Sequence, residues 1–131
     1  MSIPVELKNL ADALGRYPLA YLMTSSESGP PHAVQVDVAL QDGELLISRA
    51  GNRTRKNAQA RPAVGLLWPP QSADEYSLIV DGQAVVEGES GRSTPTRAVL
   101  HRSAPSPAPQ AGGCGSDCVE LGLDFQPSST A

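Results

Sequence analysis

The pattern of hydrophobic and polar residues predicts a chain of short strands with two short helices. From Val34 to Leu40, apolar residues alternate with polar or small ones, which is the period of a half-buried strand. Asp42-Gly43 then supplies the residues that a tight hairpin turn needs, so Leu45 to Ser48 is expected to pair back on that strand. Four further strands are expected, at Leu19–Ser25, Ala63–Trp68, Tyr76–Val86 and Thr96–His101, the third of them bent at Asp81-Gly82.

Two segments have helical spacing. Ser2 can cap a first helix that carries Leu7, Leu10 and Leu14 on one face and ends at Gly15 and Pro18. The second helix is expected from Thr54 to Ala60, with Thr54 as its N-cap, because the residue before Pro62 is driven out of the helical region.

Short strands separated by turn signals, with only two small helices, are typical of a β-sandwich or a closed barrel. The length of 131 residues fits one core, which we expect to span residues 1–102. Residues 103–131 form a tail rich in Pro, Ala and Gly, which buries too little apolar surface to order itself. Within that tail, Val119 to Phe125 alternates again and could add a strand to the barrel or to a partner chain.

Charge and hydropathy exclude several classes of partner. The net charge of -4 removes the basic field with which proteins neutralise nucleic acid, so DNA and RNA are not expected as partners. The first residues contain no continuous apolar run of the length that a signal peptide or a membrane helix needs. We therefore expect a cytoplasmic protein without a membrane partner.

The segment from Ser48 to Val64 has the parts of a phosphate site. A strand and a small Gly-Asn loop lead into a helix, whose first N–H groups and dipole favour an anion. Thr54 adds a hydroxyl, Arg55 a planar fork suited to phosphate and Lys56 a compact charge, with Arg49 and Arg53 nearby. The alternative is a capped basic helix whose charges are only solvated.

Several runs resemble the pyridoxamine-phosphate-oxidase-like family of flavin-binding split barrels, over about residues 17 to 90. They are Tyr21-Leu22-Met23-Thr24, Gly29-Pro30-Pro31-His32-Ala33-Val34, Asp42-Gly43-Glu44-Leu45-Leu46-Ile47-Ser48, Thr54-Arg55-Lys56-Asn57 and Arg61-Pro62-Ala63-Val64-Gly65-Leu66-Leu67-Trp68. The resemblance implies a mainly β fold, a six-stranded antiparallel split β-barrel with Greek-key order, a short N-terminal helix and a short helix after the third strand. It also implies a homodimer with the cofactor site between the subunits.

By the same resemblance, Thr54-Arg55-Lys56 stands where the family has Ser-Arg-Lys and holds the cofactor phosphate. In members of the family, the strand that matches Val34-Gln35-Val36 of this chain lies along the isoalloxazine ring of the flavin. The residues expected to bind the cofactor are Val34, Gln35, Val36, Ser48, Arg49, Thr54, Arg55, Lys56 and Trp68. For Gln35, Ser48 and Trp68 the alternatives are a strand-surface Gln, a strand-end Ser and a core Trp.

The function that this implies is an FMN-binding oxidoreductase with an unknown small-molecule substrate. The alternatives are a reductase that uses the deazaflavin coenzyme F-420, or a flavin- or haem-binding module without turnover. No segment matches the carboxy-terminal Trp and Arg region of the pyridoxamine phosphate oxidases proper, so pyridoxine metabolism is not the expected activity. The catalytic residues stay unknown, and the lack of an acid–base constellation is no objection because a flavin itself carries hydride transfer.

His101, Cys114 and Cys118 are the remaining candidates. Cys-x-x-x-Cys could hold a metal with His101 as a third ligand, close a small disulfide loop, or be a pair of free thiols. A structural zinc site usually has four ligands, which favours free thiols or a labile local disulfide over a metal.

Overall fold

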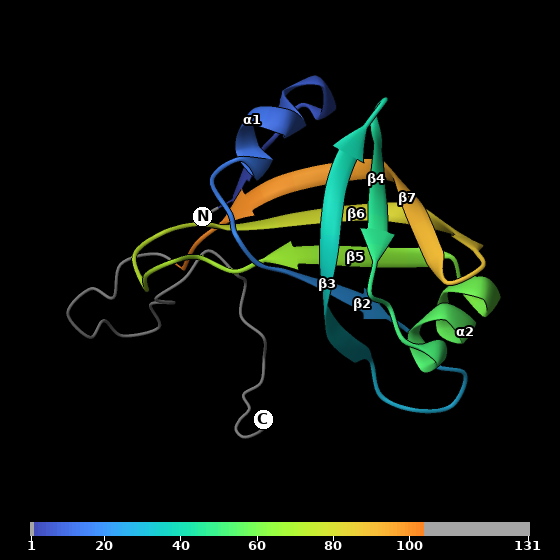
Figure 1. The fold of residues 1–131 in the computed structure, drawn as a ribbon. Helices are drawn as coiled ribbons and strands as arrows, with labels where there is room; N and C mark the ends of the chain where they lie inside the picture. Colours follow the sequence, from blue (N-terminus) through green and yellow to red (C-terminus); the bar gives the residue numbers. More distant parts are fainter. Residues whose placement is uncertain (1, 104–131) are drawn as a thin grey trace, which may run out of the picture.

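The computed structural model describes residues 2–103, which fold into a closed antiparallel barrel (Figure 1). The strands are β1 (Ser2–Pro4), β2 (Ala20–Thr24), β3 (His32–Gln41), β4 (Glu44–Ser48), β5 (Ala63–Trp68), β6 (Ser77–Glu87) and β7 (Ser90–His101). The helices are the 3-10 turn η1 (Leu7–Asn9), α1 (Leu10–Leu14) and α2 (Asn52–Ala60).

The strand order is β1-β7-β4-β3-β2-β5-β6, and the pairing of β6 with β7 closes β2 to β7 into a barrel of six strands. The expected six-stranded barrel with a short helix after its third strand is therefore confirmed, and β1 adds one further strand beside β7. The hairpin between β3 and β4 turns at Asp42 and Gly43, whose φ angles of 52° and 80° lie in the left-handed region.

The core fills the barrel with aliphatic side chains and one Trp. It is built from the inward residues of every barrel strand, among them Leu22, Val36, Ile47, Leu66, Trp68, Leu78 and Ala98. The two helices lie near opposite ends of the barrel (Figure 1), α1 with its buried residues Leu10 and Ala13 and α2 with the buried Ala58. Each helix thus buries apolar side chains against the core.

The predicted helix start at Ser2 is wrong. Residues 2–4 pair with β7 instead, with Ser2 opposite His101 and Pro4 opposite Val99. The Ser2 hydroxyl lies 3.1 Å from Nδ1 of His101 rather than over a helix end. Strand pairing has overridden the local capping signal, and Pro4 is tolerated because β1 lies at the end of the strand order.

The last strand begins at Ser90, six residues before the predicted start at Thr96. Pro95 sits where the β6–β7 register shifts, between the pairs Gly82↔Pro95 and Asp81↔Arg97, so a residue without an N–H does not break the ladder. A Cβ atom on Gly82 would lie 2.2 Å from the Ser93 hydroxyl oxygen, which explains the glycine at this bulge. The predicted bend at Asp81-Gly82 is thereby confirmed.

The barrel is split along β3. Residues 32–36 of β3 pair with β2, whereas residues 37–41 pair with β4. On the side towards β4, residues 32–36 therefore have no partner in the described ladder, because β4 ends at Ser48 opposite Asp37 and the chain turns away into α2.

The outer face of the barrel is apolar over four neighbouring strands. Tyr21 of β2 lies opposite Leu67 of β5, Leu67 opposite Ile79 of β6, and Ile79 opposite Val99 of β7. Tyr21, Leu67 and Ile79 are half-buried but do not belong to the core cluster. We call these three residues the outer apolar row. No helix within residues 2–103 is long and apolar enough to cross a membrane.

Candidate functional site

The connection from β4 to α2 positions the basic residues. After Ser48, Arg49 adopts a φ of 69°, a left-handed conformation that reverses the chain, and the buried Ala50 anchors the loop in the core. Gly51 is extended and forms the N-cap of α2. The first bond of the helix joins the Arg55 amide to the Gly51 carbonyl at 3.0 Å, so the amides of residues 52–54 precede it and have no intrahelical acceptor.

The expectation that Thr54 caps this helix is wrong, because α2 begins two residues earlier and Thr54 is its third residue. Its side chain is 2% exposed and points away from solvent. It lines a small hollow with Arg55 of α2, Ile47 of β4 and the tip of the β6–β7 hairpin. Within residues 2–103 its hydroxyl group forms no hydrogen bond.

Three cations of the first turns of α2 lack a carboxylate partner among the described residues, namely Arg53, Arg55 and Lys56. Arg53 and Lys56 are exposed, whereas Arg55 is half-buried and donates from Nη1 to the Ala50 carbonyl oxygen. Arg49 differs, because its Nη1 lies 3.5 Å from Oδ2 of Asp37. The first turn of α2 therefore combines uncompensated positive charge with free N–H groups, which favours an anion.

A buried hydrogen bond fixes α2 on the barrel. Asn57, which is 8% exposed, donates from Nδ2 to Oγ1 of Thr24 at 3.1 Å. Thr24 is 3% exposed and ends β2, opposite His32 of β3. The same bond thus relates the helix to the strand pair that contains Val34 and Val36.

Two openings flank the β4–α2 connection. The hollow lined by Thr54 and Arg55 spans about 290 Å³ of space that is partly open to solvent, and its walls are mainly apolar residues such as Leu22, Ile47 and Ala58. A wider groove of about 780 Å³ lies outside it, between β3, β4 and the β6–β7 hairpin, and includes Asp37 and Ser48. The two share Ile47, Ser90 and Gly91, so they are continuous at the hairpin.

The structure separates the predicted cofactor-binding residues into three sets. Ser48, Arg49, Thr54, Arg55 and Lys56 come together around the β4–α2 connection. Val34 and Gln35 lie on the half of β3 that β4 leaves unpaired, with Val34 half-buried and Gln35 exposed. Val36 and Trp68 are each 3% exposed and belong to the core.

His101 ends β7, where Nδ1 faces the Ser2 hydroxyl. No group of three His, Cys, Asp or Glu residues that could hold a metal occurs in the described part of the chain. Cys114, Cys118 and the alternating segment at 119–125 lie outside the described residues.

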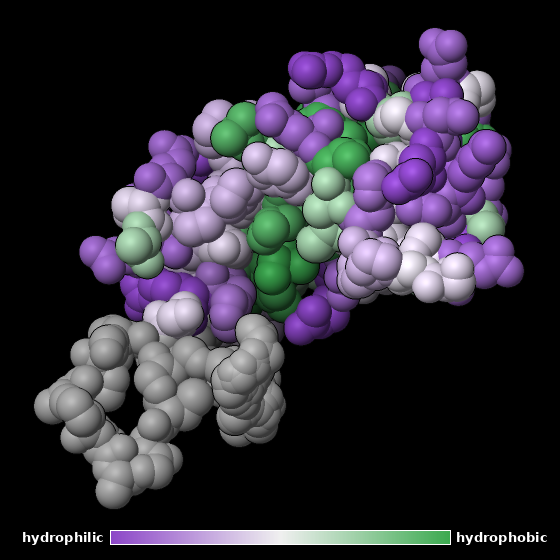
Figure 2. Space-filling model, turned by 90° about the horizontal axis from the view of Figure 1, so that it is seen from below, coloured by the Kyte–Doolittle hydropathy of each residue, from purple (hydrophilic) through white to green (hydrophobic). Residues whose placement is uncertain are grey.

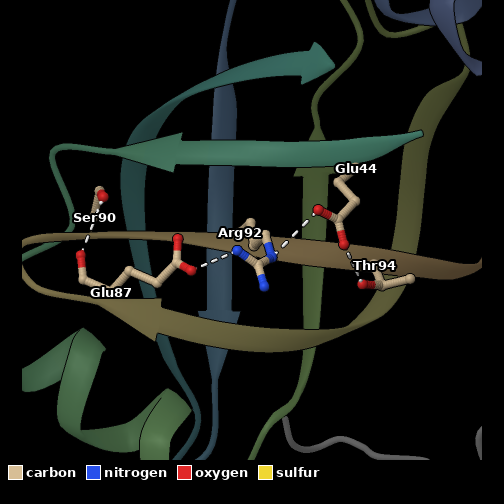
Figure 3. A network of polar contacts seen from close by, with 5 residues as sticks. All are labelled: Glu44, Glu87, Ser90, Arg92 and Thr94. Carbon is tan, nitrogen blue, oxygen red and sulfur yellow. Dashed lines mark hydrogen bonds and ion pairs between the residues drawn. The ribbon is translucent and has the colours of Figure 1, made fainter. Parts of the chain in front are cut away.

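A network of charged side chains on the outer face of β4 and β7 was not anticipated from the sequence. Nε of Arg92 is buried 3.2 Å from Oε1 of Glu44, an ion pair that is not aligned as a hydrogen bond, and Nη1 contacts Glu87 (Figure 3). The Thr94 hydroxyl donates to Oε2 of Glu44 at 3.0 Å, and Ser90 donates to the Glu87 carbonyl oxygen. Alternation within residues 90–95 was the available signal, but Gly91 and Pro95 obscured it.

Arg92 also lines the hollow that holds Thr54 and Arg55. The network therefore joins the β6–β7 hairpin to β4, and its members Arg92 and Ser90 form part of one wall of the candidate site. Asn57 and Thr24, which secure the other side of α2, were likewise missed as a pair, because a contact across 33 residues leaves no local pattern.

Comparison with known proteins gives relatives and structural neighbours. No family model matches the chain. An uncharacterized protein of Mycobacterium bovis, Mb0449c, is 41% identical over 132 aligned positions, covering 88% of this chain and 93% of the relative. An uncharacterized protein of Mycobacterium tuberculosis, MT0457, matches to the same extent.

Among solved structures, an FAD-binding protein of Mycobacterium smegmatis superimposes with a TM-score of 0.58 at 18% identity, covering 78% of this chain and 100% of that one. An FAD-binding protein of Mesorhizobium loti gives 0.57 at 15% identity, over 76% and 96% of the two chains. A candidate pyridoxamine 5'-phosphate oxidase of Listeria innocua gives 0.59 at 14% identity, over 74% and 98%. The chain therefore belongs to the same family as the two mycobacterial proteins, and its fold is that of the flavin-binding, pyridoxamine 5'-phosphate oxidase-like barrels.

Proposed function

We propose that this protein binds a flavin, specifically FMN, between two copies of the chain and acts as an oxidoreductase. The observation that carries the proposal is the first turn of α2, where Arg53, Arg55 and Lys56 have no carboxylate partner within residues 2–103 and three amides precede the first helical bond. A phosphate group is the anion that this combination of N–H groups and a guanidinium fork suits best. The neighbours with this fold include two FAD-binding proteins.

In this proposal, Lys56 and Arg55 neutralise the phosphate, and the amides of residues 52–54 donate to its oxygens. Arg55 already donates from Nη1 to the Ala50 carbonyl oxygen, and its remaining N–H groups are available to a ligand. Thr54 contributes its hydroxyl from the third position of the helix, inside the turn rather than at its cap.

The flavin ring lies along residues 34–36 of β3. Because β4 pairs only with residues 37–41, the backbone N–H and C=O groups of the preceding residues on that side are free to meet the polar edge of a ring. Gln35 projects from the exposed side of the strand. When bound, the flavin supplies hydride transfer, and the chain's own residues hold and orient it.

The outer apolar row supports a second copy of the chain as the partner. An antiparallel sheet with one solvated face normally carries polar residues there. Here Tyr21, Leu67 and Ile79 occupy the outer face instead. Figure 2, which views the molecule from below, shows a hydrophobic patch near the middle of the face turned to the viewer. A second copy packed on the outer apolar row would remove its side chains from water.

An absorption spectrum of the purified protein, with release of the bound molecule by heat and its identification by mass, tests the proposal. We expect a flavin spectrum near one molecule per chain, the mass of FMN and twice the chain mass in light scattering. A deazaflavin spectrum would instead identify coenzyme F-420 as the cofactor, and a haem spectrum would identify haem. A protein that carries no chromophore and does not take up added FMN would overturn the proposal.

A further inference from the structure

A third groove lies on the outer face of the barrel. It is near the C-terminal end of α2, the end opposite the basic first turn. Its lining includes Met23 and Thr24 of β2, Ala63 and Gly65 of β5, and Asp81 and Gln83 of β6. We call it the Gly65 groove. It spans about 770 Å³ of space open to solvent, and α2 ends at Ala60, three residues before Ala63. It shares no lining residue with the hollow that holds Thr54 and Arg55.

The groove exists because Gly65 has no side chain where it lies between Met23 and Asp81 on the outer face of the sheet. Met23 lies opposite Gly65 across the β2–β5 pair, and Gly65 lies opposite Asp81 across the β5–β6 pair. A Cβ atom built on Gly65 would lie 3.1 Å from Cε of Met23 and 3.8 Å from Oδ1 of Asp81. A larger side chain would fill the space between them. A glycine inside a strand often marks a place where a ligand approaches the backbone closely.

The polar groups of the groove favour a ligand that donates hydrogen bonds. Asp81 has a side chain that is 48% exposed, with Arg97 on one side at 3.5 Å, so carboxylate surface remains open. Gln83 is exposed and can both donate and accept.

The charge around the groove disfavours an anion. None of its lining residues that the structure describes is a lysine or an arginine, and Asp81 is acidic. The nearby end of α2 is its carboxyl end, which carries the negative end of the helix dipole. The Met23 thioether and the Ala63 side chain give the groove an apolar wall beside the floor at Gly65. Such surfaces suit a flat ring.

We propose that the Gly65 groove binds a planar heterocycle that carries N–H donors and no negative charge, of the aminopurine class. Asp81 accepts from the amino group, Gln83 pairs with the ring edge, and Met23 lies against the ring face. This site is separate from the flavin site, and either can exist without the other.

Two matched ligands test the proposal on the full-length protein. Adenosine carries the exocyclic amino group, and purine riboside differs from it by lacking that group. Each is titrated into nitrogen-15-labelled protein, and the amide shifts are followed by NMR. We expect saturable shifts at Gly65, Asp81 and Gln83 with adenosine, and at least tenfold weaker binding of purine riboside.

Two variants of groove residues test the site, and a third variant elsewhere is the control. Asp81→Asn should weaken adenosine binding about tenfold, and Gly65→Val should abolish it by filling the groove. Gly15→Ala, for which an added Cβ makes only ordinary contacts, should bind as the unaltered protein does. Equal affinity for the two nucleosides, shifts confined to the start of α2, unchanged binding by both groove variants, or no saturable shift at millimolar adenosine would each overturn the proposal. Flavin uptake, read from the absorption spectrum of the same samples, reports separately on the flavin site.

Discussion

The amide nitrogen Nδ2 of Asn57 donates to the hydroxyl oxygen of Thr24 at 3.1 Å, and both residues are buried. This bond joins the middle of α2 to the end of β2. The helix that carries the unpaired cations is therefore held in a defined orientation towards β3, since Thr24 is opposite His32. This buried bond, together with the packing of Ala58 into the core, sets the orientation of the helix that carries the proposed phosphate grip.

Replacing Asn57 by Ala should lower the free energy of unfolding by about 1–3 kcal/mol, because it leaves the Thr24 hydroxyl oxygen buried without its donor. Thr24→Val removes the acceptor in a side chain of similar shape, and Asn57→Ala combined with Thr24→Val should cost less than the sum of the two. Urea unfolding curves of the three variants measure this coupling. Strict additivity would show that the bond contributes nothing.

Arg92→Met keeps the apolar stem of the side chain and removes the charge that Glu44 and Glu87 share. Exposed ion pairs contribute little, and this half-buried pair should be worth about 1 kcal/mol. A double-mutant cycle with Glu44→Gln isolates the β4–β7 pair, with Arg97→Met as the matched control for an exposed pair on the same strand. If Arg97→Met destabilised the protein as much as Arg92→Met, the network would have no special role.

Burial raises the pKa of the Tyr17 phenol above its ordinary value of 10.0, while Arg16 lowers it and Glu75 raises it. The folded state therefore holds this proton more tightly than the unfolded chain does. The corresponding stabilisation is complete below pH 10 and is lost as the pH rises through the higher pKa of the folded protein. Tyr17→Phe should lose about 1 kcal/mol at pH 7, where the hydroxyl donates to the Tyr76 carbonyl oxygen at 2.8 Å. Its melting temperature should then fall less steeply above pH 10 than that of the unaltered protein, and equal alkaline slopes would contradict the assignment.

Leu67→Glu should convert the proposed dimer to monomers, because it places two charges in the middle of the outer apolar row. Leu7→Glu introduces the same charge at an exposed leucine of η1, and it should leave the dimer intact. Analytical ultracentrifugation at micromolar concentration separates the two outcomes. A Leu67→Glu protein that stays dimeric, or an unaltered protein that is monomeric, would contradict the proposed dimer interface on the outer apolar row.

The strands were predictable where the local pattern agrees with the fold. Ala63–Trp68 was expected with the bounds that the structure has, because Val64, Leu66 and Trp68 alternate inward and Pro62 and Pro69 limit the run. Ser2 and Thr54 show where this fails. Both are good capping residues, but Ser2 pairs with His101, which is 99 residues away in the sequence. Thr54 is drawn inside because Gly51 can begin the helix earlier.

The candidate site was predictable only in part for the same reason. The basic residues 49–56 are close in sequence, so the β4–α2 connection could be expected to gather them. Arg92, Asn57 and Thr24 reach the site through the β6–β7 hairpin and the β2–α2 contact, which depend on the tertiary fold. Trp68, a plausible lining residue in sequence, belongs to the core.

Comparison of FMN with riboflavin tests the central claim, the phosphate grip at the start of α2, most directly. Lys56→Ala is the cleaner variant, since Lys56 is exposed and forms no ion pair within residues 2–103, whereas Arg55 also supports the Ala50 carbonyl group. A charged hydrogen bond contributes about 1.5–3 kcal/mol, so Arg55→Ala should weaken FMN by roughly ten- to a hundredfold and Lys56→Ala by somewhat less. Lys8→Ala, on the distant η1 turn, serves as the control. In fluorescence-quenching titrations, we predict these losses for FMN and almost none for riboflavin, which has no phosphate. Equal losses for both ligands, or no loss for either, would contradict the account.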